Sequence, residues 1–332
     1  MPEPYKCRTE SPELLAMRSL NNRMNLPPKD KQHYFNLRKG YEGEVKFDSY
    51  TEKLQCDCII LNDLLLRVNS TTFQIDSLII TLDRVFLYEV KNFKGDYYYD
   101  SDLLYKKPKI EVINPLLQLQ RSESLLRQLL LSLGFNLPID SSVVFINPEF
   151  TLYQAPLNEP FIFSTQLNHY FKQQNTISTK IDSKHKMLAD QLVSLHMADS
   201  PFTQVAPYEY NRLRKGISCL NCDSFSLSIE GQKCVCKECG YVEVVAAAVM
   251  RCVHEFNMLF PKQEITTNII HDWCQVVNSK KRIRRILASH FNRIGVHRWT
   301  LVVLQASFLS LTRPMRDNSR RKSPCFVVHR TL

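Results

Sequence analysis

Apolar residues between positions 58 and 91 are arranged as short β-type runs. Each run is rich in β-branched or aromatic residues and is bounded by turn-forming residues, and the runs cover 58–68, 72–82 and 85–91. The pattern predicts three strands. Asp83 and Arg84 predict a tight turn that joins the last two strands into a hairpin, and Gly95 lies in the break that follows. The three tyrosines at 97–99 open a further strand or loop.

Helical patterns lie on both sides of these strands, and they cover 11–25, 40–54, 116–133 and 184–196. Pro27 and Pro28 end the first helix. Pro115 stands in the first turn of the third helix, and Gly134 ends it. A short apolar strand follows at 143–146. Helix, three strands, helix and strand in this order predict an α/β core.

The rest of the chain divides into shorter segments. Pro201 and Pro207 mark a linker, and helical periods return over 244–298. The stretch from Thr300 is apolar and then rich in arginine, with no clear period. We therefore expect an N-terminal helical extension, an α/β core, a core extension with a linker, a cysteine-rich segment, a basic helical module and a poorly specified basic tail, at 1–39, 40–150, 151–215, 216–243, 244–300 and 301–332.

Basic charge is concentrated in the C-terminal part of the chain. Residues 1–200 hold 23 Lys and Arg against 24 Asp and Glu, a net charge of −1, whereas residues 201–332 hold 20 against 9, a net charge of +11. Such an excess is typical of a module that binds a polyanion such as nucleic acid. The alternative is a solvated basic surface that has no partner.

No membrane or export segment is expected from the sequence. No apolar run reaches the roughly 20 residues that cross a bilayer. The charged N-terminus also has no apolar stretch typical of a secretory signal. We therefore expect a cytoplasmic protein without a membrane partner.

The predicted hairpin carries acidic and basic residues at positions suited to chemistry. Asp76 lies within an apolar strand, where an unpaired carboxylate is costly to bury. Glu89 and Lys91 are two positions apart on the next strand and therefore point to the same face. The turn brings Asp76 beside them. Two carboxylates favour a hard cation such as Mg²⁺ or Mn²⁺, and a lysine can orient water or stabilise charge on a phosphate.

Two further side chains extend this hypothesis. Glu44, on the preceding helix, can supply another carboxylate, and Gln118, in the first turn of the following helix, can position water or a phosphate. Each residue taken singly is more typical of a solvated helix surface. The alternative for the hairpin is that Glu89 and Lys91 form an exposed pair on a strand and Asp76 is an ordinary acid near a turn.

The stretch from about Gly40 to Phe150 resembles the nuclease-related domain (NERD) family, which is similar to the PD-(D/E)xK restriction-endonuclease-like fold. The resemblance rests on Gly43-Glu44, Gln74-Ile75-Asp76, Glu89-Val90-Lys91-Asn92 and Asn114-Pro115-x-x-Gln118, in this order. It implies a mixed sheet flanked by helices and a metal-dependent nuclease with catalytic residues Glu44, Asp76, Glu89, Lys91 and Gln118, of which Asp76 and Glu89 hold the metal. Ser77 departs from the family, since many members carry His there. The later cysteine and helical regions resemble longer members from Bacillus-like bacteria.

Five of the eleven cysteines lie between positions 219 and 239. Cys219-x-x-Cys222 and Cys236-x-x-Cys239 form two knuckles with the spacing of a four-cysteine structural zinc site. Cys234 would give poorer spacing and is left out of the ligand set. Four thiolates close the coordination sphere of Zn²⁺, so this zinc ribbon is expected to be structural.

The segment after the ribbon ends in a basic helix. Ile283, Ile286, Leu287, His290 and Phe291 follow helical spacing and alternate with cations, which indicates an amphipathic helix with a basic face. A shorter helix precedes it, so the pair resembles a helix-turn-helix or winged-helix module. The residues expected to contact nucleic acid are Lys281, Arg282, Arg284, Arg285 and Arg293. The alternative is a packed helical domain with a solvated basic face.

Two functions are compatible with these features. The first is an enzyme that cleaves DNA, in preference to RNA, with Mg²⁺ or Mn²⁺, while the zinc ribbon and basic helices bind the substrate. The second is a catalytically inactive nucleic-acid-binding or regulatory protein on a nuclease-like fold. Retention of all five polar residues favours the enzyme.

Overall fold

The computed structural model describes residues 4–176, 180–198, 203–294 and 301–303. These residues form two compact units. Unit 1 contains residues 4–9 and the described residues of 35–198, and unit 2 contains residues 10–34 and the described residues from 203 onward. In the described part of the chain, no helix is both long and apolar enough to cross a membrane.

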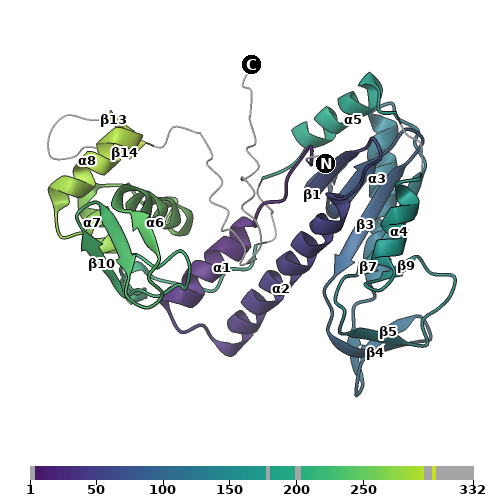
Figure 1. Cartoon of the computed structure of the whole chain (residues 1–332), viewed down its shortest axis with the longest axis horizontal. Coiled ribbons are helices and arrows are strands. Elements are labelled where there is room, and N and C mark those ends of the chain that lie inside the picture. The colour runs from purple at the N-terminus through teal and green to yellow at the C-terminus, as the bar shows by residue number, and fades with distance from the viewer. Residues whose placement is uncertain (1–3, 177–179, 199–202, 295–300, 304–332) are drawn as a thin grey trace. The chain divides into compact units, whose positions relative to one another are not determined.

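Unit 1 is built around a five-stranded mixed sheet (Figure 1). Its order is β1 (Ile59–Val68), β2 (Thr71–Ile80), β3 (Val85–Lys91), β7 (Ile139–Phe145) and β9 (Phe161–Phe163). The first three strands are antiparallel neighbours, and β3, β7 and β9 pair in parallel. The three strands and the hairpin expected from the sequence are confirmed, and the strand expected at 143–146 forms the end of β7.

Helices cover both faces of this sheet. On one face, α3 (Pro115–Ser132) and α5 (Ser183–Ser194) bury leucines against β1, β2, β3 and β7. On the other, α2 (Pro28–Thr51) and α4 (Leu167–Gln174) contribute Phe47 and Phe171 to a second core cluster. The α/β core, a mixed sheet flanked by helices, is therefore confirmed.

The helix α2 begins much earlier than the sequence indicated. The expected helix covered 40–54, whereas the structure has one continuous helix from Pro28 to Thr51. Pro28 occupies the first turn, where its missing N–H has no partner to lose. The segment 28–39 is also too polar to show a clear apolar period. The two prolines thus separate α1 (Pro12–Arg23) from α2, which begins at the second of them.

A smaller sheet in unit 1 follows the end of β3. Its order is β6 (Ile110–Val112), β5 (Leu103–Lys106), β4 (Gly95–Asp100) and β8 (Phe150–Tyr153). Figure 1 shows β4 and β5 extending away from the five-stranded sheet. The tyrosines expected to open a strand or loop lie in β4, and the other three strands were not expected.

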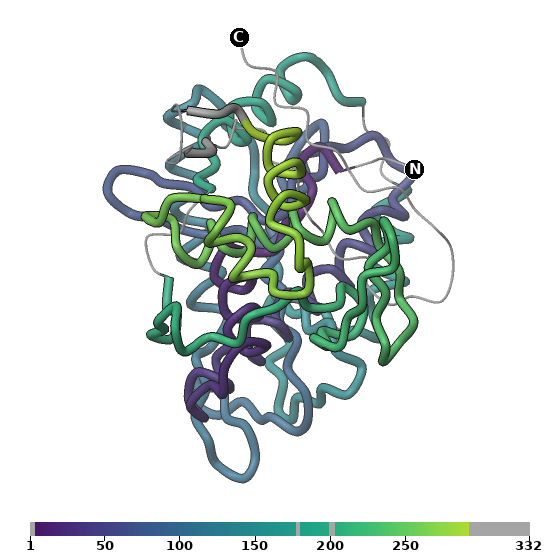
Figure 2. The backbone as a smooth tube through the Cα atoms, turned by 90° about the vertical axis from the view of Figure 1, so that its left-hand side faces the viewer, coloured from purple at the N-terminus to yellow at the C-terminus, as the bar shows by residue number. Residues whose placement is uncertain are grey.

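Unit 2 combines a three-stranded sheet with helices. The sheet consists of β10 (Leu227–Glu230), β11 (Lys233–Cys236) and β12 (Val242–Val244). After this sheet, the sequence continues with three helices, α6 (Val245–Leu259), α7 (Thr267–Cys274) and α8 (Lys280–His290). An antiparallel pair of strands follows, β13 (Asn292–Ile294) and β14 (Leu301–Val303). Helix α8 is the yellow-green coil in Figure 2.

A buried arginine joins the helices of unit 2. Arg23, at the end of α1, donates to both carboxylate oxygens of Glu255 on α6, at 2.9 and 2.6 Å. Its guanidinium also lies over the ring of the fully buried Trp273 on α7, 4.1 Å from the ring centre. A charged group is tolerated here because its donors are paired and its flat face stacks on an aromatic ring.

Unit 1 is expected to lose stability in mild acid through His196. The Nδ1 atom of His196 accepts a hydrogen bond from the backbone N–H of Leu65 in β1, which requires a neutral ring. Burial lowers the pKa of His196 below its usual value. The unfolded chain therefore takes up a proton near pH 6.5 more readily than the folded chain, and this contribution to stability, present above pH 6.5, is lost as the pH falls below it.

Replacing His196 by Gln should reduce this acid dependence. The measurement is urea unfolding at pH 7.5 and pH 5.5, with His169→Gln, an exposed histidine on α4, as the matched control. At pH 7.5 the His196→Gln variant is expected to lose about 1–3 kcal/mol because the Leu65 N–H loses its partner. Its further loss at pH 5.5 should be smaller than that of the wild type, and an equal loss would contradict this role.

Candidate active site and metal centre

The strand register of unit 1 places Asp76 opposite Glu89. Ser77 of β2 pairs with Tyr88 of β3, and continuing this antiparallel register by one position brings Asp76 and Glu89 together. Both residues are buried, with relative exposures of 7% and 1%. Residues opposite each other in a sheet project from the same face. The hairpin therefore carries two carboxylates side by side.

Lys91 connects this pair to the following helix. Its Nζ atom lies 2.6 Å from Oε1 of Glu89 and 2.9 Å from Oε1 of Gln118, and it donates to both. Gln118 lies in the first turns of α3, which Asn114 caps by accepting from the N–H of Leu116 at 3.0 Å. The cap sets where α3 begins and hence where Gln118 lies.

Glu44 reaches the same place from α2. Its Oε2 atom accepts a hydrogen bond of 2.6 Å from Nη1 of Arg8, and Nη2 of the same guanidinium donates to the main-chain oxygen of Asp76 at 2.7 Å. The Oδ2 atom of Asp76 accepts from the N–H of Val90 at 2.7 Å. The structure thus brings together the five residues Glu44, Asp76, Glu89, Lys91 and Gln118, which we call the carboxylate site.

A close approach between α2 and the end of β3 makes this arrangement possible. A Cβ atom on Gly43 would lie 2.5 Å from Cβ of Asn92, so only glycine fits at this crossing. Asn92 fixes the crossing by donating to the main-chain oxygen of Lys39 at 2.8 Å and accepting from Asn147 at 2.9 Å. The Gly43-Glu44 pair therefore has a geometric reason: the glycine lets the next residue reach the site.

Burial and mutual repulsion perturb the acids of the carboxylate site. Burial, followed by the nearby Asp76 carboxylate, raises the pKa of Glu44 and of Glu89 to about 8 in each case. Burial also raises the pKa of Asp76. For Lys91, burial alone would lower the pKa, but Glu89 and Asp76 outweigh it and the pKa is raised. The raised pKa values mean that these acids retain protons, which reduces the repulsion between neighbouring carboxylates. A bound cation would reduce the same repulsion between the ionised groups.

Each of the three carboxylates has one oxygen that is available to a cation. Among the described residues, no donor reaches Oε1 of Glu44, Oδ1 of Asp76 or Oε2 of Glu89. None of these oxygens is among the unpartnered polar atoms that are sealed from solvent in the described part of the chain. Open, hard oxygen donors beside paired ones fit a divalent cation such as Mg²⁺ or Mn²⁺. Within the described residues, however, these three groups do not form a cluster with all ligand atoms within 4.8 Å of one another.

Comparison with known families identifies this part of the molecule. Residues 39–146 match the nuclease-related domain family. The match runs from α2 to the end of β7 and contains all five residues of the carboxylate site. No curated protein and no solved structure matched the chain. The nuclease-related domain expected from the sequence is thus confirmed, and with it a nuclease-like fold for this segment.

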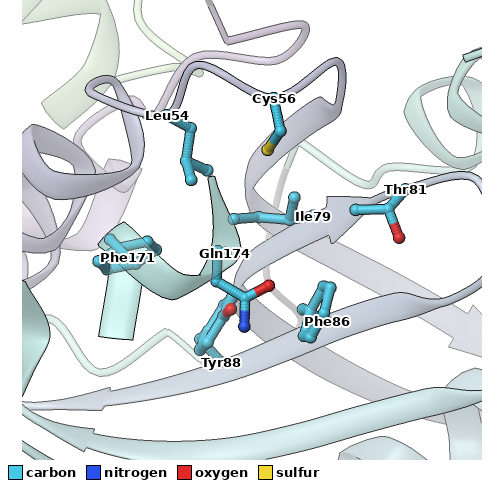
Figure 3. Close-up of a pocket in the computed structure, with 8 residues that line it drawn as sticks. All are labelled: Leu54, Cys56, Ile79, Thr81, Phe86, Tyr88, Phe171 and Gln174. Atoms are coloured by element: carbon cyan, nitrogen blue, oxygen red, sulfur yellow. The ribbon is translucent and has the colours of Figure 1, made fainter. Parts of the chain in front are cut away.

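A crevice beside the five-stranded sheet does not involve the carboxylate site. It is a mostly apolar crevice lined by Leu54, Cys56, Ile79, Thr81, Phe86, Tyr88, Phe171 and Gln174 (Figure 3). Phe86 and Tyr88 alternate with Glu89 and Lys91 along β3, so they point to the opposite face. The crevice therefore belongs to the core between the sheet and α4.

In unit 2, the four predicted zinc ligands converge. The Sγ atoms of Cys219 and Cys239 are 3.6 Å apart, as are those of Cys222 and Cys236, and all four lie within 4.8 Å of one another. Zn–S bonds of about 2.3 Å in a tetrahedron separate the sulfurs by about 3.8 Å, so these residues fit a zinc ion. Among the described residues, they are the one group of three or more His, Cys, Asp or Glu placed for a metal. The cluster is compatible with a zinc ribbon.

The local backbone explains this convergence. The N–H of Asp223 donates to the oxygen of Cys219 at 3.1 Å, and the N–H of Gly240 donates to the oxygen of Cys236 at 2.9 Å, which closes a tight turn in each knuckle. Gly240 has a φ of +70°, which glycine adopts without strain. Cys234 lies outside the metal-compatible cluster, in agreement with the sequence.

The basic helix of unit 2 has the expected two faces. Ile283, Ile286 and Leu287 are buried on one side of α8. On the other side, Lys281, Arg284 and Arg285 are exposed, and Arg282 is partly exposed. No described residue forms an ion pair with these four cations. Arg293 belongs to β13, and the predicted tail beyond residue 303 lies outside the described residues.

The sequence did not reveal the cation that completes the charge pattern of the carboxylate site, Arg8. Arg8 pairs with Asp48, one turn after Glu44, through Nε–Oδ2 and Nη2–Oδ1 distances of 2.8 and 3.0 Å. Glu44 and Asp48 are four positions apart on α2, so they share one face of this helix. Nothing in the sequence around Arg8 indicates its partners.

Zinc content provides a direct test of the cysteine cluster. Full-length protein purified in a zinc-containing medium is expected to carry one zinc per chain. Cys222→Ser should lose most of this zinc because three thiolates leave the tetrahedral site incomplete. Cys234→Ser, which changes a buried thiol outside the cluster, should keep it. Elemental analysis decides the outcome, and retention of zinc by Cys222→Ser would contradict the ligand assignment.

Proposed function

We propose that the protein is a metal-dependent nuclease that hydrolyses phosphodiester bonds in nucleic acid, with DNA as its substrate in preference to RNA. The carboxylate site is its active site, and Mg²⁺ or Mn²⁺ is its cofactor. Unit 2, with a structural Zn²⁺, binds the nucleic acid. The protein acts in the cytoplasm.

One observation carries this proposal. A nuclease-related domain presents three neighbouring carboxylates, those of Asp76 and Glu89 buried and that of Glu44 partly buried. Each has one oxygen held by the protein and one oxygen open, beside a lysine fixed by two acceptors. A purely structural cluster would be expected to pair both oxygens of each buried acid. The open oxygens therefore support binding of an ion and a substrate.

The side chains divide the chemical work as follows. Asp76 and Glu89 would hold the divalent ion, which would polarise a phosphate oxygen of the substrate and make the attacking water more acidic. Lys91, ion-paired to Glu89 at 2.6 Å, stabilises the negative charge that develops on the phosphate and orients the attacking water. Gln118 holds Lys91 in place. Glu44 supplies a further oxygen at the edge of the site.

Unit 2 supports the same function. Its α8 presents four cations without ion-pair partners among the described residues. Three helices followed by an antiparallel strand pair, α6 to β14, have the chain order of a winged-helix module. Residues Lys281, Arg282, Arg284, Arg285 and Arg293 are the proposed phosphate contacts.

The second candidate function is nucleic-acid binding without cleavage. The observation that favours it is that the carboxylate ligand atoms do not all lie within 4.8 Å of one another. Under this alternative, DNA binds in a salt-sensitive manner and stays intact with every divalent ion.

Cleavage assays with two substitutions test the proposed activity. Asp76→Asn should abolish cleavage of DNA in Mg²⁺ or Mn²⁺ because it removes a charged ligand. Lys91→Gln should lower the rate by about 10²–10³-fold because it removes a group that stabilises developing charge. Both variants should still bind DNA. The assay measures product formation from labelled double- and single-stranded DNA and from RNA.

Matched controls separate these effects from general damage. Asp83→Asn removes an exposed acid from the turn of the same hairpin, and Lys186→Gln removes an exposed lysine from α5. Both are expected to cleave at the wild-type rate. Full activity of Asp76→Asn, or no cleavage by the wild type with any divalent ion, would exclude the proposed active site.

The salt dependence of binding tests the role of α8. The double substitution Arg284→Gln, Arg285→Gln should weaken DNA binding and reduce the slope of log K against log salt concentration by about 2, since each phosphate contact contributes about 0.9. Arg212→Gln, Lys262→Gln removes the same charge elsewhere in unit 2 and should leave the slope nearly unchanged. Equal slopes for the two double variants would show that α8 does not contact phosphates. Binding is measured by fluorescence anisotropy without divalent ions.

A further inference from the structure

The N-terminal segment of the described chain forms an additional edge beside β1. The N–H of Tyr5 donates to the oxygen of Ile60 at 2.8 Å, and the N–H of Asn62 donates to the oxygen of Lys6 at 3.0 Å. Lys6 and Leu61 form a parallel bridge. This segment precedes the nuclease-related domain, which begins at residue 39. It carries Arg8 into the carboxylate site.

Arg8 makes more hydrogen bonds than the pairing of one buried acid requires. Its side chain is 2% exposed and makes four hydrogen bonds. Two form a fork on the Asp48 carboxylate, one goes to Oε2 of Glu44, and one goes to the main-chain oxygen of Asp76. A fork to Asp48 would suffice to neutralise one buried acid. The other two bonds extend the guanidinium across the residues that flank the proposed metal position.

We propose that Arg8 is a positioning residue that acts as a fixed cation in place of a second divalent ion, so that the carboxylate site binds a single metal. The inference rests on the proposed function. Two-metal sites hold their ions about 3.5–4 Å apart between shared carboxylates. The guanidinium takes one oxygen of Glu44 and the main-chain oxygen of Asp76, which are the groups that a second ion between these residues would need.

The number of Mn²⁺ ions bound by the full-length, zinc-loaded protein tests this inference. Mn²⁺ is titrated and followed by electron paramagnetic resonance, and the binding of Asp76→Asn is subtracted as background. The wild type should bind one Mn²⁺ with the spectrum of an isolated ion. Arg8→Gln should bind two, with the spectrum of a coupled pair, because it removes the fixed cation. Arg8→Lys keeps the charge and should bind one.

Arg84→Gln is the matched control, because it removes an exposed arginine from the same unit and should bind one Mn²⁺. Two ions in the wild type, or one ion in a folded Arg8→Gln variant, would overturn the inference. The wild-type spectrum needs no substitution, so a coupled pair of ions in the wild type would overturn the inference even if Arg8→Gln does not fold. One bound ion without any nucleic-acid cleavage would overturn the proposed function and leave the role of Arg8 standing. No Mn²⁺ above background would overturn both.

Discussion

Electrostatic repulsion between neighbouring carboxylates is the constraint on which the carboxylate site of unit 1 depends. Asp76 and Glu89 are buried and Glu44 is partly buried beside them, and the Asp76 carboxylate raises the pKa of both glutamates. Such a cluster is stable only when the protein supplies partners. Arg8, Lys91 and the N–H of Val90 each satisfy one oxygen, and three oxygens stay open. The site is therefore held in place without a metal and still has ligands to offer to one.

Several features of the fold follow from the need to bring these partners together. The N-terminal segment pairs with the edge of β1 and so delivers Arg8. Gly43 lets α2 pass within contact of Asn92, so that Glu44 reaches the end of β3. Pro115 and the Asn114 cap start α3 where Gln118 meets Lys91. In unit 2, the groups that are brought together are four cysteines, and two local turns of the backbone bring them together.

The sequence predicted what local spacing determines. The two-residue period of β3 placed Glu89 and Lys91 on one face, and the paired knuckles identified the four zinc-type ligands. Glu44 and Gln118 were candidates from their places on the flanking helices, but no periodicity connects them to the hairpin, and the family resemblance supplied that link. Arg8 could not be predicted, because its partners lie 36, 40 and 68 positions away. The short strands β5, β6 and β8 were missed because runs of three or four residues carry too weak an apolar period.

Anomalous diffraction tests most directly whether the carboxylates of unit 1 bind a divalent cation. Crystals of the full-length protein soaked in Mn²⁺ are measured at the manganese absorption edge. We expect one anomalous peak in unit 1, within about 2.0–2.4 Å of Oδ1 of Asp76 and Oε2 of Glu89. A fully soaked crystal with no peak at these two oxygens, while Mn²⁺ binds elsewhere on the chain, would contradict it.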